Sequence, residues 1–264
     1  MLKQFVLMFA IVIGFGSIIT HADESAQKAA TQAEPLNLAV ASDFVPTAEV
    51  IGKEFTELTG MPVKITSDSS EALLQMIKKG GQFDVYMSAN TNYPIDLEKS
   101  GYTEGAPEIY AIGTLALYAK GKELTHSGLD VLQPGGFTKL AVANPKVSSY
   151  GVASIETLKK LEIYEQVQSQ IVYADNVDKA LQMVESGEAD AGLVSYGDLS
   201  DEQQSKAWIV PGRMHSHIRQ SLVILKGANV PAAQKWVKFM ESDTVKNILI
   251  SSGFGVTNVE KVTQ

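Results

Sequence analysis

Two short polar segments follow apolar runs at points where a helix should begin. Ser42 and Asp43 come after the run 36–41, and Ser69 and Ser70 come after the run 63–66. The first N–H groups of a helix are unpaired and its dipole is positive at that end, so such junctions favour anions. If both junctions face one cleft, they form a receptor for a small oxyanion.

The carboxylate of Asp43 conflicts with this chemistry, and Asp68 adds a second carboxylate close by. Two like charges about 4 Å apart repel by on the order of 4 kcal/mol at an effective dielectric constant of 20. A repulsion of this size would weaken the affinity for the anion by nearly a thousandfold. Asp43 either caps the following helix or faces the ligand. A strong oxyanion site requires its carboxyl group to be turned away or protonated.

The N-terminus has the pattern of a secretory signal. Lys3 precedes an almost wholly apolar run over 5–19, and Thr20-His21-Ala22 fits a cleavage site. We predict a signal peptide over 1–22 and a flexible leader over 23–35, and hence a periplasmic protein. The alternative is an uncleaved membrane anchor, but the run is short against the roughly 20 residues that a spanning helix needs.

Composition excludes several classes of protein. The formal net charge is −8, and no basic stripe is present that could contact the phosphates of a nucleic acid. The chain has no cysteine, which excludes disulfides, thiolate catalysis and a lipidated N-terminal cysteine. No Walker loop, nucleophile elbow or His-Glu-x-x-His pattern occurs. We therefore expect a monomeric binding protein without a cofactor rather than an enzyme.

Short apolar strands alternate with amphipathic helices, which indicates an α/β fold. In the helix that follows the first strand, Val50, Phe55 and Leu58 are predicted to face inward. The stretches 111–118 and 219–225 bracket a central block with its own strand–helix units. We predict a first lobe over 36–113 plus 224–264 and an inserted second lobe over 114–223. The predicted strands are 36–41, 63–66, 83–88, 114–118, 139–143, 170–173, 191–194, 208–210 and 221–225, and the predicted helices after the first are 71–79, 94–99, 150–161, 177–186, 232–240 and 244–251.

Several local patterns occur in a familiar order. They are Ala-Val-Ala-Ser-Asp at 39–43, Ser-Asp-Ser-Ser at 67–70, Gly-Gln-Phe-Asp-Val-Tyr-Met-Ser-Ala at 81–89, Ala-Asn-Pro-Lys-Val-Ser-Ser-Tyr-Gly at 143–151, Asp-Asn-Val at 175–177 and Ile-Arg-Gln-Ser-Leu-Val-Ile-Leu at 218–225. Each is weak alone. Together, from about residue 36 to 257, the chain resembles the periplasmic molybdate-binding proteins of ABC importers, which are type II solute-binding proteins.

The resemblance implies a two-lobed Venus-flytrap fold, each lobe a mixed, mostly parallel sheet flanked by helices, joined by two crossing segments. It implies a tetrahedral dianion, molybdate or tungstate, held by hydroxyl and backbone N–H groups and delivered to a permease in the inner membrane. In the family, the position of Asp43 is usually uncharged. The ligand contacts that the resemblance implies fall on Ser42, Asp43, Ser69, Ser70, Tyr150 and the backbone of Val177, with Tyr196 matching a ligand-binding Tyr of another subgroup at a shift of one position.

Other interpretations remain open. Asp43 and Asp68 also suit the same fold with a different solute, an organic acid or a hydroxylated or cationic ligand. As an acid–base pair they would suit an enzyme, although no nucleophile stands beside a base. A surface adhesin on the same fold is a further alternative.

Four more residues have structural interpretations. Asp84, inside a strand, is expected to pair with backbone groups. Arg219, at the predicted crossover, suits a structural or hinge-locking role. His215 and His217 have the spacing of a metal pair on a strand. No third ligand stands at a suggestive spacing, so we expect solvated histidines.

Overall fold

A computed structural model describes residues 34–126, 128–256 and 260–261. The predicted signal peptide and nearly all of the predicted leader, residues 1–33, lie outside the described residues. Within the described ranges, no helix is both long and apolar enough to cross a membrane.

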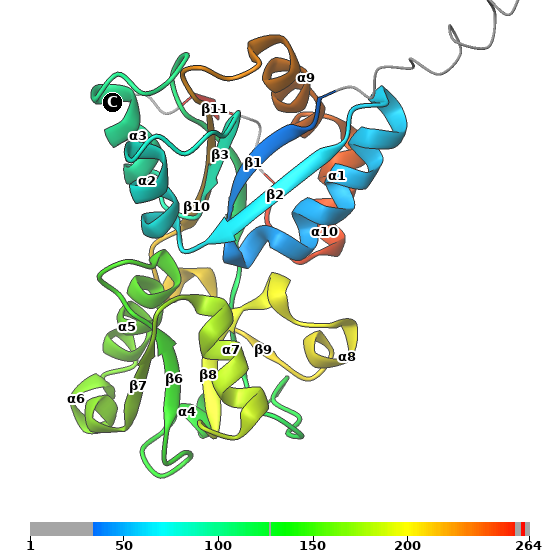
Figure 1. Cartoon of the computed structure of the whole chain (residues 1–264). Coiled ribbons are helices and arrows are strands. Elements are labelled where there is room, and N and C mark those ends of the chain that lie inside the picture. The colour runs from blue at the N-terminus through cyan, green and yellow to red at the C-terminus, as the bar shows by residue number, and fades with distance from the viewer. Residues whose placement is uncertain (1–33, 127, 257–259, 262–264) are drawn as a thin grey trace, which may run out of the picture. The chain divides into compact units, whose positions relative to one another are not determined.

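The first lobe is built on a six-stranded mixed sheet (Figure 1). Strand β1 pairs in parallel with β2 and β3, whereas β10 runs antiparallel to β3 and β4, and β11 antiparallel to β4. In spatial order the strands are β11 (Glu260–Lys261), β4 (Glu108–Gly113), β10 (Ile218–Ile224), β3 (Val85–Ser88), β1 (Leu36–Ala41) and β2 (Val63–Asp68).

The second lobe is built on a five-stranded mixed sheet. Strand β6 pairs in parallel with β7 and β8, whereas β5 is antiparallel to β8 and β9. In spatial order the strands are β7 (Ile171–Ala174), β6 (Leu140–Ala143), β8 (Ala191–Ser195), β5 (Leu115–Tyr118) and β9 (Trp208–Ile209).

Helices flank both sheets (Figure 1). Those of the first lobe are η1 (Ser42–Phe44), α1 (Val45–Thr59), α2 (Ser70–Lys78), α3 (Asn92–Lys99), α9 (Val230–Met240) and α10 (Asp243–Ser251). Those of the second lobe are α4 (Gly128–Leu132), α5 (Ser149–Lys160), α6 (Tyr164–Val167), η2 (Gln168–Gln170), α7 (Val177–Ser186), η3 (Tyr196–Asp198), α8 (Asp201–Gln204) and η4 (Gly212–Met214).

The two-lobed α/β fold with mixed sheets confirms the expected fold class, with two corrections. The sheets are not mostly parallel, because the strands next to the crossings pair antiparallel with their neighbours. The predicted second boundary at 223/224 lies too late. Ile218 pairs with Gly113 and Val223 with Tyr86, so all of β10 belongs to the first sheet. We place the proposed boundary before Ile218.

Helix α1 shows how the first core is packed. Its buried apolar stripe contains Ala48, Ile51 and Phe55, and the Phe55 ring meets Trp236 edge-on, with ring centroids 5.2 Å apart. Phe55 therefore faces inward as predicted. The same prediction is wrong for Val50 and Leu58, which are 49% and 71% exposed. Val50 lies off this stripe, whereas Leu58 has the spacing of the stripe but lies in the last turn of the helix.

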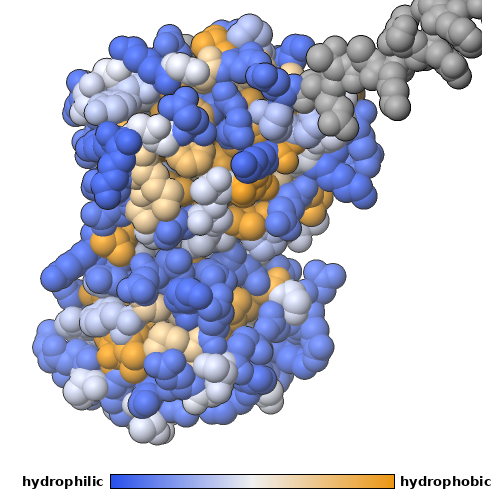
Figure 2. Space-filling model, viewed as in Figure 1, coloured by the Kyte–Doolittle hydropathy of each residue, from blue (hydrophilic) through white to orange (hydrophobic). Residues whose placement is uncertain are grey.

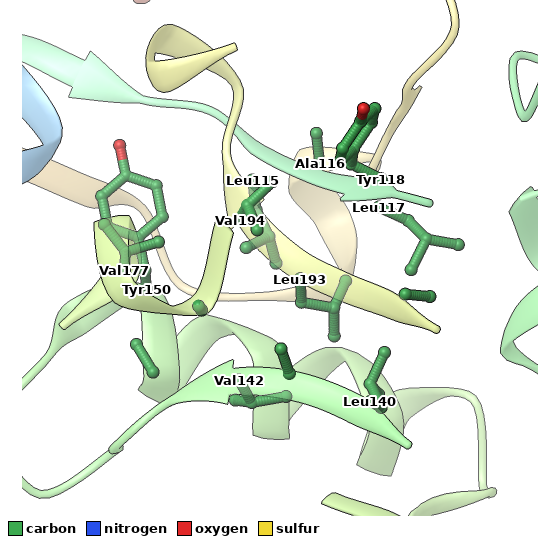
Figure 3. Close-up of a cluster of buried hydrophobic side chains, with 14 of the residues drawn as sticks. Leu115, Ala116, Leu117, Tyr118, Leu140, Val142, Tyr150, Val177, Leu193 and Val194 are labelled. Carbon is green, nitrogen blue, oxygen red and sulfur yellow. The ribbon is translucent and has the colours of Figure 1, made fainter. Parts of the chain in front are cut away.

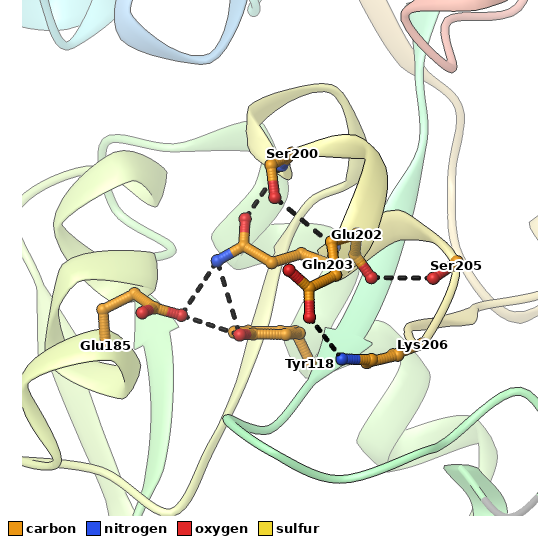
Figure 4. A network of polar contacts seen from close by, with 7 residues as sticks. All are labelled: Tyr118, Glu185, Ser200, Glu202, Gln203, Ser205 and Lys206. Atoms are coloured by element: carbon orange, nitrogen blue, oxygen red, sulfur yellow. Dashed lines mark hydrogen bonds and ion pairs between the residues drawn. The ribbon is translucent and has the colours of Figure 1, made fainter.

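A polar network fastens α8 to the second sheet (Figure 4). The Tyr118 hydroxyl donates to Glu185 Oε1 at 2.7 Å, and Gln203 Nε2 donates to the same oxygen at 2.9 Å. Ser200 and Gln203 form a capping box at the start of α8. These contacts join β5, α7 and α8, so this short helix is held by side chains as well as by its own backbone.

An apolar area on the first lobe lies at the edge of its sheet. Figure 2 shows orange surface over the region of β2 and α1. Strand β2 is an edge strand, and Val63 and Ile65 line a groove beside it together with charged residues of α1. This groove shares no residue with the cavity between the lobes.

The chain crosses between the lobes twice, from β4 to β5 and from β9 to β10. At the first crossing, Thr114 Oγ1 donates to the Gly253 carbonyl at 2.7 Å, and the Tyr196 N–H donates to the Thr114 carbonyl at 2.9 Å. The Tyr196 ring packs against Gly253, where a Cβ would overlap it. The lobes are therefore in contact beside the crossing.

Candidate functional site

A small polar cavity lies between the lobes. Its volume is about 20 Å³. The cavity suits a ligand of a few atoms. It is lined by Ala41, Ser42, Asp43, Ser69, Ser70, Ala89, Val147, Ser148, Ser149, Tyr150, Asn176 and Val177.

Three helices begin at this cavity, and each is capped by a polar side chain. Ser69 Oγ accepts from the Ala72 N–H at the start of α2, at 3.2 Å. Ser148 caps α5 in the same way at 3.4 Å, and Asn176 caps α7 at 2.8 Å. Each cap takes the third N–H of its helix. The first two N–H groups have no acceptor within a helix and remain available to an anion.

The hydroxyl groups of α2 are oriented by the protein itself. Ser70 is buried, and its Oγ accepts from the Ala89 N–H at 3.1 Å. A serine oxygen that accepts from a backbone N–H still has its own proton to donate. Ser69 and Ser70 can therefore both donate O–H groups into the cavity.

Asp43 is not the cap of α1. It lies within η1, and the N-cap position of α1 is Phe44, with no side-chain hydrogen bond. Instead, Asp43 Oδ2 accepts from Gln220 Nε2 at 2.5 Å, and Gln220 Oε1 lies 3.5 Å from the Tyr110 hydroxyl that donates to it. The capping interpretation is wrong because the 3₁₀ turn places Asp43 one residue too early and directs it toward β10.

The site is electrostatically unusual because its lining contains a buried acid, Asp43, and no cation among the described residues. Burial raises the pKa of Asp43 from 3.8 to about 6, and the hydrogen bond from Gln220 offsets part of this rise. Burial and the nearby Asp43 also raise the pKa of Asp198 well above its usual value. Among the residues described as lining the cavity, none is Lys, Arg or His.

The second carboxylate, Asp68, does not line the cavity. Its Oδ1 accepts from the Ser69 N–H at 2.6 Å, at the end of β2. It therefore supports the loop that carries Ser69. This removes one of the two acids on which a hydroxylated or cationic ligand was suggested.

Tyr150 enters the cavity from α5. Its ring lies beside Val177 in the second core, and its hydroxyl extends away from the apolar cluster (Figure 3). The hydroxyl is buried and faces Ser195 and the Asp43 carboxyl, and its hydrogen bond with Asp43 helps to lower the pKa of that carboxyl. A Cβ at Gly113 would overlap this oxygen, so the crossing strand needs glycine there.

The structure thus brings Ser42, Asp43, Ser69, Ser70, Tyr150 and Val177 to one cavity. It does not bring Tyr196 there, because this ring packs against Gly253 in the contact between the lobes. Sequence reasoning missed three polar lining residues, Ser148, Ser149 and Asn176. The signal that could have found them is the one used for Ser69: a hydroxyl or amide residue between a strand and a helix.

The residues given structural interpretations behave differently from one another. Asp84 pairs with backbone groups as expected, accepting from the N–H groups of Asn37 at 2.7 Å and Asn229 at 2.8 Å. Arg219 is exposed and forms no ion pair with any described residue, so the structure shows no hinge lock. His215 and His217 precede β10, and the described residues contain no cluster suited to a metal ion.

Comparisons with known proteins identify the family of this chain. The family model of bacterial extracellular solute-binding proteins matches residues 36–255. The molybdate-binding protein ModA of Azotobacter vinelandii is 31% identical over 232 residues, covering 86% of this chain and 92% of that protein. ModA of Rhodobacter capsulatus is 30% identical, covering 82% of this chain and 86% of that protein.

A solved structure shows the same likeness in three dimensions. The periplasmic molybdate-binding protein of Azotobacter vinelandii matches with a TM-score of 0.79 and 28% identity, covering 84% of this chain and 99% of that one. The matching families are solute-binding proteins of transport systems. The chain belongs to the family of bacterial extracellular solute-binding proteins, alongside the ModA molybdate-binding proteins.

Proposed function

We propose that this chain captures a tetrahedral oxyanion, molybdate or tungstate, in the interlobe cavity and delivers it to an ABC permease of the inner membrane. The observation that carries the proposal is the convergence of three capped helix starts, α2, α5 and α7, and the η1 turn on one cavity of about 20 Å³. The ModA relatives are molybdate-binding proteins by name, which supports the choice of anion.

The donors of the cavity suit an anion that accepts hydrogen bonds. The hydroxyls of Ser42, Ser69 and Ser70 and the first N–H groups of α5 and α7, including those of Tyr150 and Val177, would surround the four oxygens. Hydrogen bonds to a charged group are each worth about 1.5 to 3 kcal/mol. Several such bonds can therefore hold a dianion without a lysine or arginine.

The size of the cavity argues against a bulky organic solute. Pockets for drug-sized organic solutes measure roughly 300 to 1,000 Å³, whereas this cavity measures about 20 Å³. An organic acid would require the lobes to part, and Asp68 would not face it. The oxyanion is favoured for both reasons.

Titration calorimetry tests the proposal. Protein purified from the periplasmic fraction is titrated with molybdate, tungstate, sulfate and phosphate, and we expect molybdate and tungstate to bind most tightly. Ser42→Ala should weaken binding, whereas Ser169→Ala, an exposed serine outside the cavity, should not. Absence of heat and of a thermal shift with all four anions would refute the proposal.

The location of the protein belongs to the same proposal. Export by the predicted signal and cleavage after Ala22 would release a monomer that diffuses between the site of capture and the permease. The intact mass of the periplasmic form checks the cleavage position, and its size in solution checks the monomer. A mass that retains residues 1–22 would contradict release.

A further inference from the structure

Asp43 differs from the other polar groups of the cavity because it has a charge to lose. It is 2% exposed, lines the cavity, and has one carboxyl oxygen held by the Gln220 amide. Gln220 is fully buried on β10 and is itself linked to Tyr110. The carboxyl group is therefore fixed in place beside the ligand position and cannot move out to solvent without breaking this chain of hydrogen bonds.

The groups that face Asp43 offer no compensating positive charge. From β4 comes Tyr110 and from α5 comes Tyr150, both neutral hydroxyls. From η3 comes Asp198, whose buried Oδ2 has no partner among the described residues, and Asp178 of α7 acts on Asp198 in turn. The surroundings are therefore neutral or acidic on every packed side, and a dianion would add two further negative charges.

We propose that Asp43 takes up one proton from solvent when the dianion binds and then donates this O–H to an anion oxygen. This inference rests on the proposed function and deepens it. The proton comes from water or buffer and joins the carboxylate, and no bond of the anion is broken. Asp43 thereby becomes a donor like Ser42 and Ser69, and the cavity accepts the dianion with only donors around it.

Proton uptake can be measured as the number of protons bound with each anion and as the pH dependence of the dissociation constant. Burial already raises the pKa of Asp43 to about 6 in the absence of ligand. At pH 7.5 the free carboxyl is then almost wholly ionised, so binding should take up about one proton. Between pH 7.5 and 8.5 the dissociation constant should rise by about tenfold, because the binding of each anion is coupled to the uptake of one proton from solvent.

The test is calorimetry with molybdate at pH 7.5 in PIPES, HEPES and Tris, whose ionisation enthalpies differ. The slope of the observed enthalpy against the buffer's ionisation enthalpy counts the protons taken up. We expect about one for the wild type and about zero for Asp43→Asn, which keeps a partner for Gln220 and supplies an amide donor. Asp198→Asn is the matched control and should still take up about one proton.

The possible outcomes distinguish proton uptake by Asp43 from oxyanion binding itself. Binding with no proton uptake in the wild type overturns this inference and leaves the proposed function standing. No heat with molybdate in any buffer overturns the proposed function and this inference together. Uptake that persists in Asp43→Asn, or that is lost only in Asp198→Asn, overturns the assignment to Asp43. If Asp43→Asn does not fold, Asp43→Ser and the wild-type slope give the same decision.

Discussion

Replacing Asp43 by Asn should stabilise the ligand-free protein, and the gain should depend on pH. A buried carboxyl whose pKa is raised from 3.8 to about 6 holds its proton more tightly in the folded state than in the unfolded state. Its contribution to stability is fully present below pH 3.8 and is lost as the pH rises to about 6. Above that pH the ionised carboxylate opposes folding by about 3 kcal/mol.

The Asn variant has no charge to bury and retains an acceptor for Gln220 Nε2. Its advantage over the wild type should be about 3 kcal/mol at pH 8 and about half as large at pH 5. Urea denaturation of both proteins at these two pH values, without ligand, measures the difference. An advantage that does not grow between pH 5 and pH 8, or a variant less stable than the wild type at pH 8, would refute the reasoning.

Asp190 provides a control of opposite sign. Hydrogen bonds from the Lys139 and Thr138 N–H groups hold the pKa of this exposed carboxyl below its usual value. Its stabilising contribution is therefore present above the unfolded-state pKa and is lost as the pH falls. Asp190→Asn should lower stability at pH 8 and have less effect at pH 4, the reverse of the pattern for Asp43.

Three further substitutions separate binding from folding. Ser42→Ala should raise the dissociation constant for molybdate by about 10-fold to 100-fold, the value of one hydrogen bond to a charged group, and leave the melting temperature of the free protein nearly unchanged; calorimetry and thermal denaturation check both. Gly113→Ala should weaken molybdate binding in the same titration by displacing the Tyr150 hydroxyl, and unchanged affinity would contradict that packing. Asp84→Ala should lower the free energy of unfolding by about 2 to 4 kcal/mol, because it leaves two backbone N–H groups without an acceptor; urea denaturation measures this loss, and a change below about 0.5 kcal/mol would place Asp84 among ordinary surface substitutions.

The fold could be predicted from local patterns because each strand and helix is marked by its own residues. The apolar run 36–41 is strand β1, and helix α7 begins at Val177 after its cap and ends at Ser186, directly before Gly187, as the sequence indicates. Strand pairing is not marked in this way. The strand at 218–224 pairs with residues more than 100 positions earlier in β3 and β4, and no local pattern specifies to which lobe such a strand returns.

The residues of the candidate site also differ in whether local patterns or long-range contacts determine their positions. Ser69 could be predicted because capping and anion binding both act within a few residues of a helix start. The position of the Asp43 carboxyl could not, because it depends on Gln220, which lies 177 residues away. Tyr196 was misplaced because its ring packs against Gly253, a contact between the lobes. Residues close to a helix start could therefore be assigned to the cavity from the sequence. Long-range packing determines where the Asp43 carboxyl and the Tyr196 ring lie.

Occupation of the cavity between the lobes by a tetrahedral oxyanion can be observed directly. Crystals grown with tungstate allow the metal to be located by anomalous scattering, independently of any assumption about the site. We expect one strong anomalous peak in the cavity, at a distance from Ser42, Ser69, Tyr150 and Val177 that the anion's oxygens bridge by hydrogen bonds. A peak elsewhere on the protein, or none at saturating tungstate, would contradict it.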